Sequence, residues 1–270
     1  METSVGLIGC GKMGTALASA FVKKGVVSST HLVLFDKRAK QQEQLAATIK
    51  GVEAKTAAEC CERSEVVLLA VKPQDFPALL TSIRDQAKAG RTFVSIAAGV
   101  LFSSLRAELG EDCSLVRAMP NRPALVGAAV TALMGDALTS EDAVAHVDRL
   151  FRAAGSTVRL NDEMHFNAVT AVSGSGPAFF FRLTEGLIAG GCKAGLEPAV
   201  AHRLAIATAY GAGKLLMETD TSPAEERKAV SSPGGTTVAG LNVLSRNRFF
   251  ETVVEAVVGA ADRCRELGRS

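Results

Sequence analysis

Residues 230–244, VSSPGGTTVAGLNVL, combine turn residues and hydroxyl side chains in a pattern suited to binding an anion. After a proline, Gly234 and Gly235 admit positive φ and a close backbone approach. Thr236 or Thr237 can cap a helix over the following apolar run, whose first N–H groups would face the loop. Such a turn is a cradle for a carboxylate or a phosphate, with hydroxyls at its lip. An ordinary linker between two helices is the other interpretation.

A second motif with chemical meaning, GCGKMG, occupies residues 9–14. It follows a short apolar run and precedes an apolar-periodic stretch, which is the strand–turn–helix context that GxGxxG requires. There, Gly9 allows the tight turn, Gly11 lets backbone approach a pyrophosphate, and Gly14 lets the helix pack on the strand. The motif therefore predicts a dinucleotide site made by Gly9, Cys10, Gly11, Lys12, Met13 and Gly14.

The residues after the second predicted strand, 32–35, bear on which dinucleotide binds. Asp36 lies about 20 residues beyond the glycines, where an acidic side chain normally bonds the adenosine ribose and favours NAD. Lys37 and Arg38 can instead hold a ribose phosphate, which favours NADP, or can simply begin a solvated helix. We expect NADPH as the cofactor, with NADH as the alternative.

Further loops are expected at the same edge of the sheet, because open α/β sheets bind ligands at the carboxyl ends of their strands. A strand predicted over 66–70 is closed by Val71, Lys72, Pro73 and Gln74, and Lys72 lies where a cofactor would pass. The strand predicted at 114–117 leads in the same way into Asn121, which we also assign to the cofactor. Each loop alone is more often a turn than a site, but together they outline a cofactor trough.

These loops need a sheet to position them, and the first 160 residues provide its pattern. Additional strands are predicted near Val52 and at 92–96, 129–134 and 156–159, with helices between them. Such alternation means a parallel, doubly wound sheet. We therefore predict an α/β chain whose N-terminal part, residues 1–160, is a doubly wound Rossmann-type domain that binds a dinucleotide.

From residue 161 to residue 270 the apolar period becomes helical. Helices are predicted over 164–172, 178–188, 198–217, 223–230 and 249–267, with Gly190, Gly191 and Gly195 breaking the second. These helices are apolar around much of their circumference, so one small bundle offers them too few partners. We therefore predict an all-helical dimerisation domain over 161–270, forming an intertwined dimer.

Composition narrows the class of function. The 270 residues are 47% apolar and 21% charged, which is ordinary for a soluble protein, and the net charge of +2 comes without a basic block. Nucleic-acid and membrane partners are therefore not indicated, and no run reaches the roughly 18 uncharged apolar residues of a spanning helix. The sequence starts directly with a strand pattern, and its six cysteines show no CxxC or metal-ligand spacing. We expect free thiols, a cytoplasmic location and no metal site.

In combination, the motifs resemble those of one enzyme family. The glycine loop with Met13, AVKPQ, AAG, MPN, SGSGPA and above all VSSPGGTTVAGLNVL resemble, in order and spacing, the pyrroline-5-carboxylate reductases. The likeness covers essentially the whole chain, and SPGGTT is its most specific part. The resemblance implies reduction of (S)-1-pyrroline-5-carboxylate to L-proline, the last step of proline biosynthesis, with NADPH or NADH.

The resemblance also implies roles for individual residues. The nicotinamide side of the cofactor would be lined by Ala70, Val71, Lys72 and Pro73. The substrate carboxylate would be bound by Ser232, Gly234, Gly235 and Thr236, and Thr237 would place its hydroxyl against the imine nitrogen as the catalytic residue. In this family the helical domain dimerises near the active site, and dimers commonly assemble into a ring of five. Since a protonated imine is already electrophilic, positioning supplies most of the catalysis and we expect neither a covalent nucleophile nor a metal.

The chain departs from the family pattern at a few positions, and two rival functions are to be weighed against the resemblance. Four positions differ in ways that concern cofactor contacts and assembly, namely Ala57, Arg122, Ala189 and Glu226. One rival is a reductase of another imine or a hydroxy acid; hydroxy-acid members usually carry a catalytic Lys in the first long helix after the Rossmann domain, yet residues 164–188 contain none. The other rival is a non-catalytic dinucleotide sensor, which has no reason to keep a second anion cradle.

Overall fold

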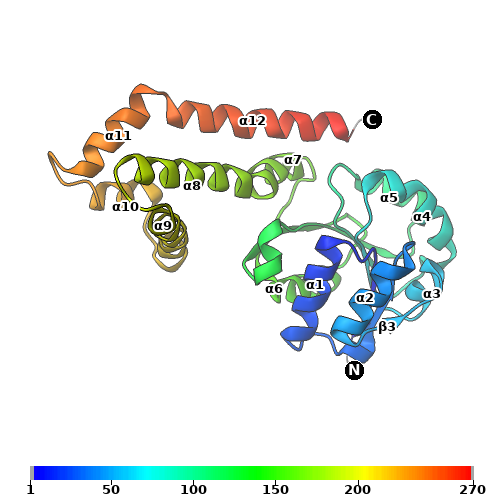
Figure 1. The fold of residues 1–270 in the computed structure, drawn as a ribbon. Helices are drawn as coiled ribbons and strands as arrows, with labels where there is room; N and C mark the ends of the chain where they lie inside the picture. The colour runs from blue at the N-terminus through cyan, green and yellow to red at the C-terminus, as the bar shows by residue number, and fades with distance from the viewer. Residues whose placement is uncertain (1–2, 269–270) are drawn as a thin grey trace. The chain divides into compact units, whose positions relative to one another are not determined.

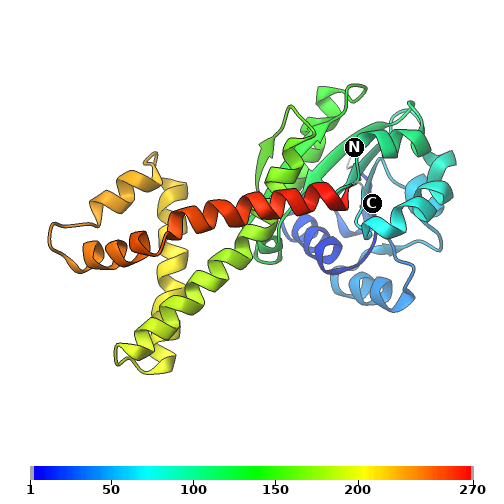
Figure 2. The same ribbon diagram turned by 90° about the horizontal axis from the view of Figure 1, so that it is seen from above.

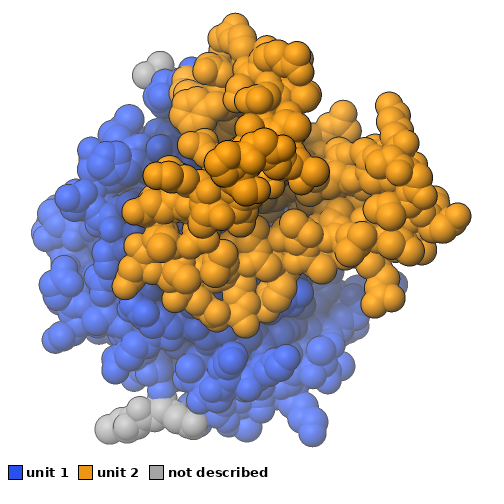
Figure 3. Space-filling model, turned by 90° about the vertical axis from the view of Figure 1, so that its left-hand side faces the viewer, with its two compact units in different colours: residues 1–174, 260–270 blue, residues 175–259 orange. Residues whose placement is uncertain are grey.

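The structure is a computed structural model and describes residues 3–268. It contains two compact units, coloured separately in Figure 3. The first runs to residue 174 and takes in the C-terminal residues from 260 onwards, and the second comprises residues 175–259. The division into domains at residue 160 stays a prediction.

One eight-stranded sheet forms the centre of the first unit, with strand order β3-β2-β1-β4-β5-β6-β7-β8. Its strands are β1 (Val5–Ile8), β2 (Leu32–Phe35), β3 (Val52–Glu53), β4 (Val66–Leu69), β5 (Thr92–Ser95), β6 (Ser114–Met119), β7 (Ala129–Gly135) and β8 (Gly155–Arg159). Because β1 lies between β2 and β4, the chain changes its direction of winding there. This switch point is where open α/β sheets bind dinucleotides.

One pair of strands corrects the prediction of a wholly parallel sheet. β6 and β7 are antiparallel, with Met119 opposite Ala132, whereas the other neighbouring pairs are parallel. Only residues 120–128, which include the 3₁₀-helix η4 (Arg122–Val126), connect the two strands. A parallel crossover takes a dozen or more residues, so this connection can only return the chain antiparallel.

Helices cover both faces of the sheet, which confirms the doubly wound arrangement (Figure 1). One face carries α1 (Lys12–Lys23), α2 (Ala39–Ile49) and α6 (Glu141–Arg152) and the other α3 (Ala57–Glu62), α4 (Phe76–Ile83) and α5 (Phe102–Leu109), with 3₁₀ turns at η1 (Ser29–His31), η2 (Pro73–Asp75) and η3 (Arg84–Gln86). Each face encloses its own apolar core. In the first, the Phe21 ring meets the Phe151 ring edge-on at 6.1 Å between centroids.

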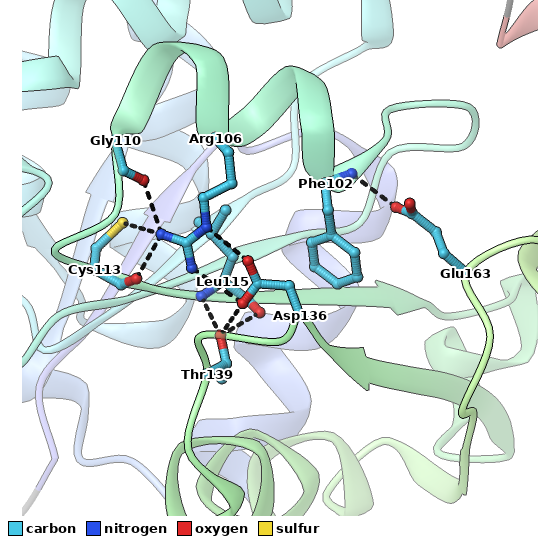
Figure 4. A network of polar contacts seen from close by, with 8 residues as sticks. All are labelled: Phe102, Arg106, Gly110, Cys113, Leu115, Asp136, Thr139 and Glu163. Carbon is cyan, nitrogen blue, oxygen red and sulfur yellow. Dashed lines mark hydrogen bonds and ion pairs between the residues drawn. The ribbon is translucent and has the colours of Figure 1, made fainter.

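A largely buried ion pair ties α5 to the antiparallel strands (Figure 4). Arg106 donates from Nε and Nη2 to the two Asp136 oxygens at 2.6 and 3.0 Å, and from Nη1 to the carbonyl oxygens of Gly110 and Cys113. Thr139 Oγ1 donates to Asp136 Oδ1 at 2.6 Å. Burial acts to raise the pKa of Asp136, but the hydrogen bonds from Arg106 and Thr139 outweigh it and lower that pKa.

The helical half begins with a helix that changes its winding. α7 (His165–Val169) passes into a π-helix, η5 (Thr170–Ser175), and this continues directly as α8 (Gly176–Lys193). The predicted break at SGSGP is therefore a wider helical turn and not a loop. π-helices are rare and occur frequently at functional sites.

The remaining helices are α9 (Pro198–Glu218), α10 (Pro223–Ala229), α11 (Thr236–Arg246) and α12 (Phe249–Leu267). Gly190 and Gly191 lie inside α8, which corrects the prediction that they end it; the left-handed residue is Gly195, with φ +100°. A Cβ on Gly191 would lie 3.2 Å from the Ala201 Cβ of α9. The glycine thus allows α8 and α9 to lie close together beside their connecting turn, as Figure 2 shows.

The second unit buries few of its own side chains. Of residues 175–259, only Gly176, Ala201 and Ala205 are buried. Large apolar side chains stay exposed on several helices, among them Phe180, Tyr210, Met217 and Phe250. Exposed apolar surface of this extent marks an interaction surface, so the helical unit is built to associate.

Candidate active site

Three loops that follow β1, β2 and β4 meet at the C-terminal edge of the sheet. The Gly9 N–H donates to the Phe35 carbonyl oxygen at 2.8 Å, and the Ala70 N–H donates to that of Ile8 at 2.8 Å. Gly9 has φ +107°, and a Cβ there would lie 2.7 Å from the carbonyl atoms of Ala70. Only glycine fits, because a side chain would be strained and would collide. The structure thus brings together three of the loops assigned to the cofactor, those after β1, β2 and β4.

The glycine turn leaves space at the start of α1. A Cβ on Gly14 would lie 2.1 Å from the Gly9 carbonyl oxygen, whereas a Cβ on Gly11 would meet nothing within 4 Å. No side chain caps α1, so its first N–H groups, next to the exposed Lys12 and half-buried Met13, are open to a ligand. Free space, open donors and the positive end of a helix fit the pyrophosphate of a dinucleotide.

The Asp36 carboxylate is engaged within the protein. Its Oδ2 accepts the Cys10 N–H at 2.7 Å, its Oδ1 accepts the Arg38 N–H at 2.8 Å, and the residue is only 7% exposed. The Asp36 N–H donates to Gln42 Oε1 at 2.9 Å, and Gln42 Nε2 donates to the Ala54 carbonyl oxygen. Asp36 therefore braces the glycine loop against the turn after β2. Sequence reasoning missed Gln42, because a single glutamine in an amphipathic helix carries no recognisable signal.

Two cationic side chains stand beside Asp36. Lys37 Nζ lies 2.6 Å from Asp75 Oδ1, and Arg38 Nε lies 3.5 Å from Asp36 Oδ1. The Arg38 side chain is 59% exposed and lies in the turn between β2 and α2. Asp75 ends η2, in the loop after β4, and was not among the residues predicted for the site.

The other predicted cofactor residues differ in how open they are. Burial, and next the nearby Asp36 carboxylate, raises the pKa of the Cys10 thiol to about 12, so this thiol stays neutral. Ala70 and Val71 are half-buried, Lys72 is exposed and Pro73 begins η2. Each of these residues lies on the loop that follows β4.

Asn121 is buried and holds three segments together. Its Oδ1 accepts the Val130 N–H of β7 at 3.0 Å, and its Nδ2 donates to the Ser173 carbonyl oxygen of the π-helix at 3.1 Å. The side chain thus joins the turn after β6 to β7 and to the start of the helical half. A direct cofactor contact by Asn121 stays a prediction.

The loop before α11 forms the second candidate site, in the other unit. The Gly235 N–H donates to the Ser232 carbonyl oxygen at 2.9 Å, and Gly234 has φ +73°, which favours glycine. Gly235 is the N-cap, so Thr236 and Thr237 are the first residues of the helix and neither caps it, contrary to expectation. No side chain caps α11, which leaves the first N–H groups open to an anion.

Side chains around this loop differ in exposure. Ser232 and Thr236 are exposed, whereas Thr237 is half-buried. Among residues 3–268, the Thr237 hydroxyl has no hydrogen-bond partner. It is thus available to a ligand.

Of the positions that depart from the family pattern, Ala57 is the first residue of α3 and is buried in the core. Glu226 Oε1 accepts a hydrogen bond from Thr221 Oγ1 at 2.5 Å. Among the described residues, no three His, Cys, Asp or Glu side chains are arranged to hold a metal. Nor is any helix in residues 3–268 both long and apolar enough to cross a membrane.

Comparison with known proteins supplies the family. A family model described as pyrroline-5-carboxylate reductase dimerisation matches residues 163–267, and one described as NADP oxidoreductase, coenzyme F420-dependent, matches residues 4–99. The pyrroline-5-carboxylate reductase of Synechocystis is 35% identical over 269 residues, covering the whole of both chains. The chain belongs to the pyrroline-5-carboxylate reductase family. The Arabidopsis thaliana reductase is 36% identical over 98% of this chain and 96% of its own length.

Solved structures of this reductase family share the fold. The pyrroline-5-carboxylate reductase from Coxiella burnetii matches with a TM-score of 0.94 at 26% identity, over 99% of each chain. The Plasmodium falciparum reductase, solved with NADP bound, matches with a TM-score of 0.88 at 26% identity, again over 99% of each chain. The expected fold, a doubly wound Rossmann-type domain followed by a helical dimerisation domain, is confirmed.

Proposed function

We propose that this chain is an NAD(P)H-dependent oxidoreductase that reduces (S)-1-pyrroline-5-carboxylate to L-proline, the last step of proline biosynthesis. The observation that carries the proposal is the full-length likeness to named pyrroline-5-carboxylate reductases. A dinucleotide turn in one unit and an anion cradle in the other supply the two binding functions that the reaction needs. The same likeness favours this function over a reductase of another substrate and over a sensor.

The substrate carboxylate binds at the N-terminus of α11. The open N–H groups of Thr236 and Thr237 donate to it, and the helix dipole favours its negative charge. Gly234 and Gly235 keep this approach free of side chains, and the Ser232 hydroxyl lies at the lip. Binding the carboxylate here fixes the position of the imine ring relative to the first turn of α11.

Thr237 acts on the imine nitrogen. Its hydroxyl accepts a hydrogen bond from the protonated imine and so orients the C=N bond. The nicotinamide, when bound, supplies the hydride to the carbon of that bond. The chain contributes position: Gly9, Gly11 and the α1 N-terminus hold the pyrophosphate, and the loop from Ala70 to Pro73 lines the nicotinamide side.

NADPH is the preferred donor, with NADH as a weaker alternative. Both Asp36 oxygens already accept backbone N–H groups, which leaves this carboxylate poorly placed to select a ribose hydroxyl. The exposed Arg38 side chain offers a guanidinium to a ribose phosphate. The NADP bound to the Plasmodium falciparum relative supports the same preference.

The enzyme assembles as an intertwined homodimer, and five such dimers form a ring. The match to a dimerisation model and the exposed apolar side chains of the second unit support self-association. The six cysteines are free thiols, which fits a cytoplasmic location. Sedimentation of the purified enzyme would distinguish a dimer from a decamer.

Steady-state assays test the reaction directly. Purified protein is given pyrroline-5-carboxylate with NADPH and, in parallel, with NADH, and oxidation of each is followed. Turnover with both, and a higher kcat/KM with NADPH, is the expected result. Absence of oxidation with either donor, in protein that is folded and self-associated, would overturn the proposal.

A further inference from the structure

The ion pair between Lys37 and Asp75 joins two of the loops of the cofactor site. Lys37 follows β2, Asp75 lies in the loop after β4, and these two strands flank β1. The pair, with 2.6 Å between Nζ and Oδ1, therefore spans the end of β1, from which the glycine turn begins. The Lys37 side chain is 67% exposed and that of Asp75 31% exposed.

The charges at this corner are balanced. Lys37 is paired with Asp75, and Arg38 lies beside Asp36. A ribose phosphate carries about −1.5 to −2 charges, so it needs cationic groups that are not already neutralised. With Lys37 held by Asp75, the Arg38 guanidinium is the more available of the two cations.

We propose that Asp75 is a specificity-determining residue that weakens the preference for NADPH by holding Lys37 away from the ribose phosphate. The inference rests on the proposed use of NADPH. It predicts that removing the Asp75 charge is enough to strengthen binding of a 2′-phosphate, without the introduction of a new cation. Asp75 is suited to the test because its side chain caps no helix, so replacing it leaves the fold intact.

Nucleotide fragments separate this effect from turnover. Calorimetric titration with 2′,5′-ADP and with 5′-AMP compares ligands that differ in the 2′-phosphate. In Asp75→Asn we expect 2′,5′-ADP to bind about three- to fivefold more tightly, the size of one exposed charge pair, with binding of 5′-AMP unchanged. The gain should shrink as salt is added, since exposed charges are screened.

A double-mutant cycle assigns the gain to Lys37. Lys37→Gln alone should change 2′,5′-ADP binding little, whereas the same change in the Asp75→Asn background should abolish the gain. Equal tightening for both ligands, no tightening for either, or a gain that survives Lys37→Gln would overturn the inference.

The outcome for the unmodified protein distinguishes this inference from the proposed function. If the unmodified protein binds 5′-AMP but discriminates against 2′,5′-ADP, the NADPH preference fails, while the predicted gain in Asp75→Asn is still measurable. If it binds neither fragment, the dinucleotide assignment and the inference fall together. Arg38→Gln serves as the matched control, since it should weaken 2′,5′-ADP and spare 5′-AMP.

Discussion

At the scale of single residues, the Thr237 hydroxyl carries the most specific claim about the chemistry. Thr237→Ala removes one charge-assisted hydrogen bond, worth about 1.5–3 kcal/mol. Reduction of pyrroline-5-carboxylate should therefore slow by about 10–150-fold without being abolished, because substrate and donor are still positioned. Steady-state kcat/KM for the variant measures the loss.

Thr237→Ser is the matched control, since it keeps the hydroxyl at the same position of α11. It should retain most of the activity, while Thr237→Ala keeps the same affinity for NADPH. An alanine variant with unchanged catalytic efficiency would contradict the role given to Thr237.

Residue types predicted some roles at the site and missed others. The glycines at 9, 11 and 14 could be assigned from spacing alone: at Gly9 and Gly14 the structure leaves no room for a side chain, and at Gly11 it leaves open space for a ligand. Asp36 could not, because its hydrogen bonds to the Cys10 and Arg38 N–H groups depend on how two loops meet. The Lys37–Asp75 pair joins residues 38 positions apart, and no local pattern indicates such a contact.

Among the structural elements, the turn between β1 and α1 contains two glycines that are required for different reasons. At Gly14 the fold leaves no room for a side chain, whereas at Gly11 the space is needed by the ligand. Gly14→Ala places a Cβ 2.1 Å from the Gly9 carbonyl oxygen, so the turn must shift, at a cost of about 1–3 kcal/mol in the free energy of unfolding. Gly11→Ala meets nothing and has φ −71°, so stability should change by less than about 0.5 kcal/mol.

For NADPH affinity we expect Gly11→Ala to be the more damaging of the two substitutions. The Cβ of Gly11→Ala occupies the space proposed for the pyrophosphate, so NADPH should bind markedly less tightly to a protein of normal stability. Urea unfolding and NADPH titration of the two variants give the comparison. A stable Gly11→Ala protein with normal NADPH affinity would place the pyrophosphate elsewhere.

The Arg106–Asp136 pair gives the fold a dependence on acid. The pKa of Asp136 is lowered in the folded protein, so its contribution to stability is present above the ordinary carboxyl pKa of 3.8 and is lost as the pH falls through the lower folded value. Asp136→Asn should therefore cost about 2–4 kcal/mol near neutral pH and less in acid. Urea unfolding at neutral and acid pH, with and without the substitution, measures this difference.

Glu185→Gln is a suitable control, since its ion pair with Arg182 is exposed and should contribute little at either pH. A cost of Asp136→Asn that stays constant from neutral pH to acid would contradict the assignment.

Elements were predictable where a local period sets them. The strand at 32–35 and the helix at 249–267 have the predicted bounds, because a short continuous apolar run and a clean apolar stripe mark them in the sequence. The π-helix at 170–175 and the continuation of α8 through Gly190 and Gly191 could not be predicted, because propensity alone indicates a break at these positions. At Gly191 the close approach of Ala201 from α9 gives the glycine a packing role instead. The antiparallel direction of β7 could have been predicted from the sequence, because the connection from β6 is too short for a parallel crossover.

At the scale of the whole molecule, the contrast between the two units explains why the chain must associate. The first unit encloses two apolar cores of its own, whereas the second leaves most of its large apolar side chains exposed. On α12, Phe250, Val254 and Val258 lie four residues apart on one face and are 73%, 45% and 54% exposed. Such a stripe gains stability only against a partner surface, and the dimerisation match gives that partner as a second copy.

Val254→Glu should therefore dissociate the dimer into monomers. Burying an unpaired charge in the apolar stripe costs more free energy than the contact between the two copies provides. Sedimentation at micromolar concentration should show monomers, and turnover should fall, while calorimetric binding of 2′,5′-ADP persists, since the first unit has its own cores. Glu251→Gln on the same helix is the control and should remain associated. If the Val254→Glu protein stays associated, the interface lies on another face. If it dissociates and also loses nucleotide binding, the first unit depends on the dimer for its fold.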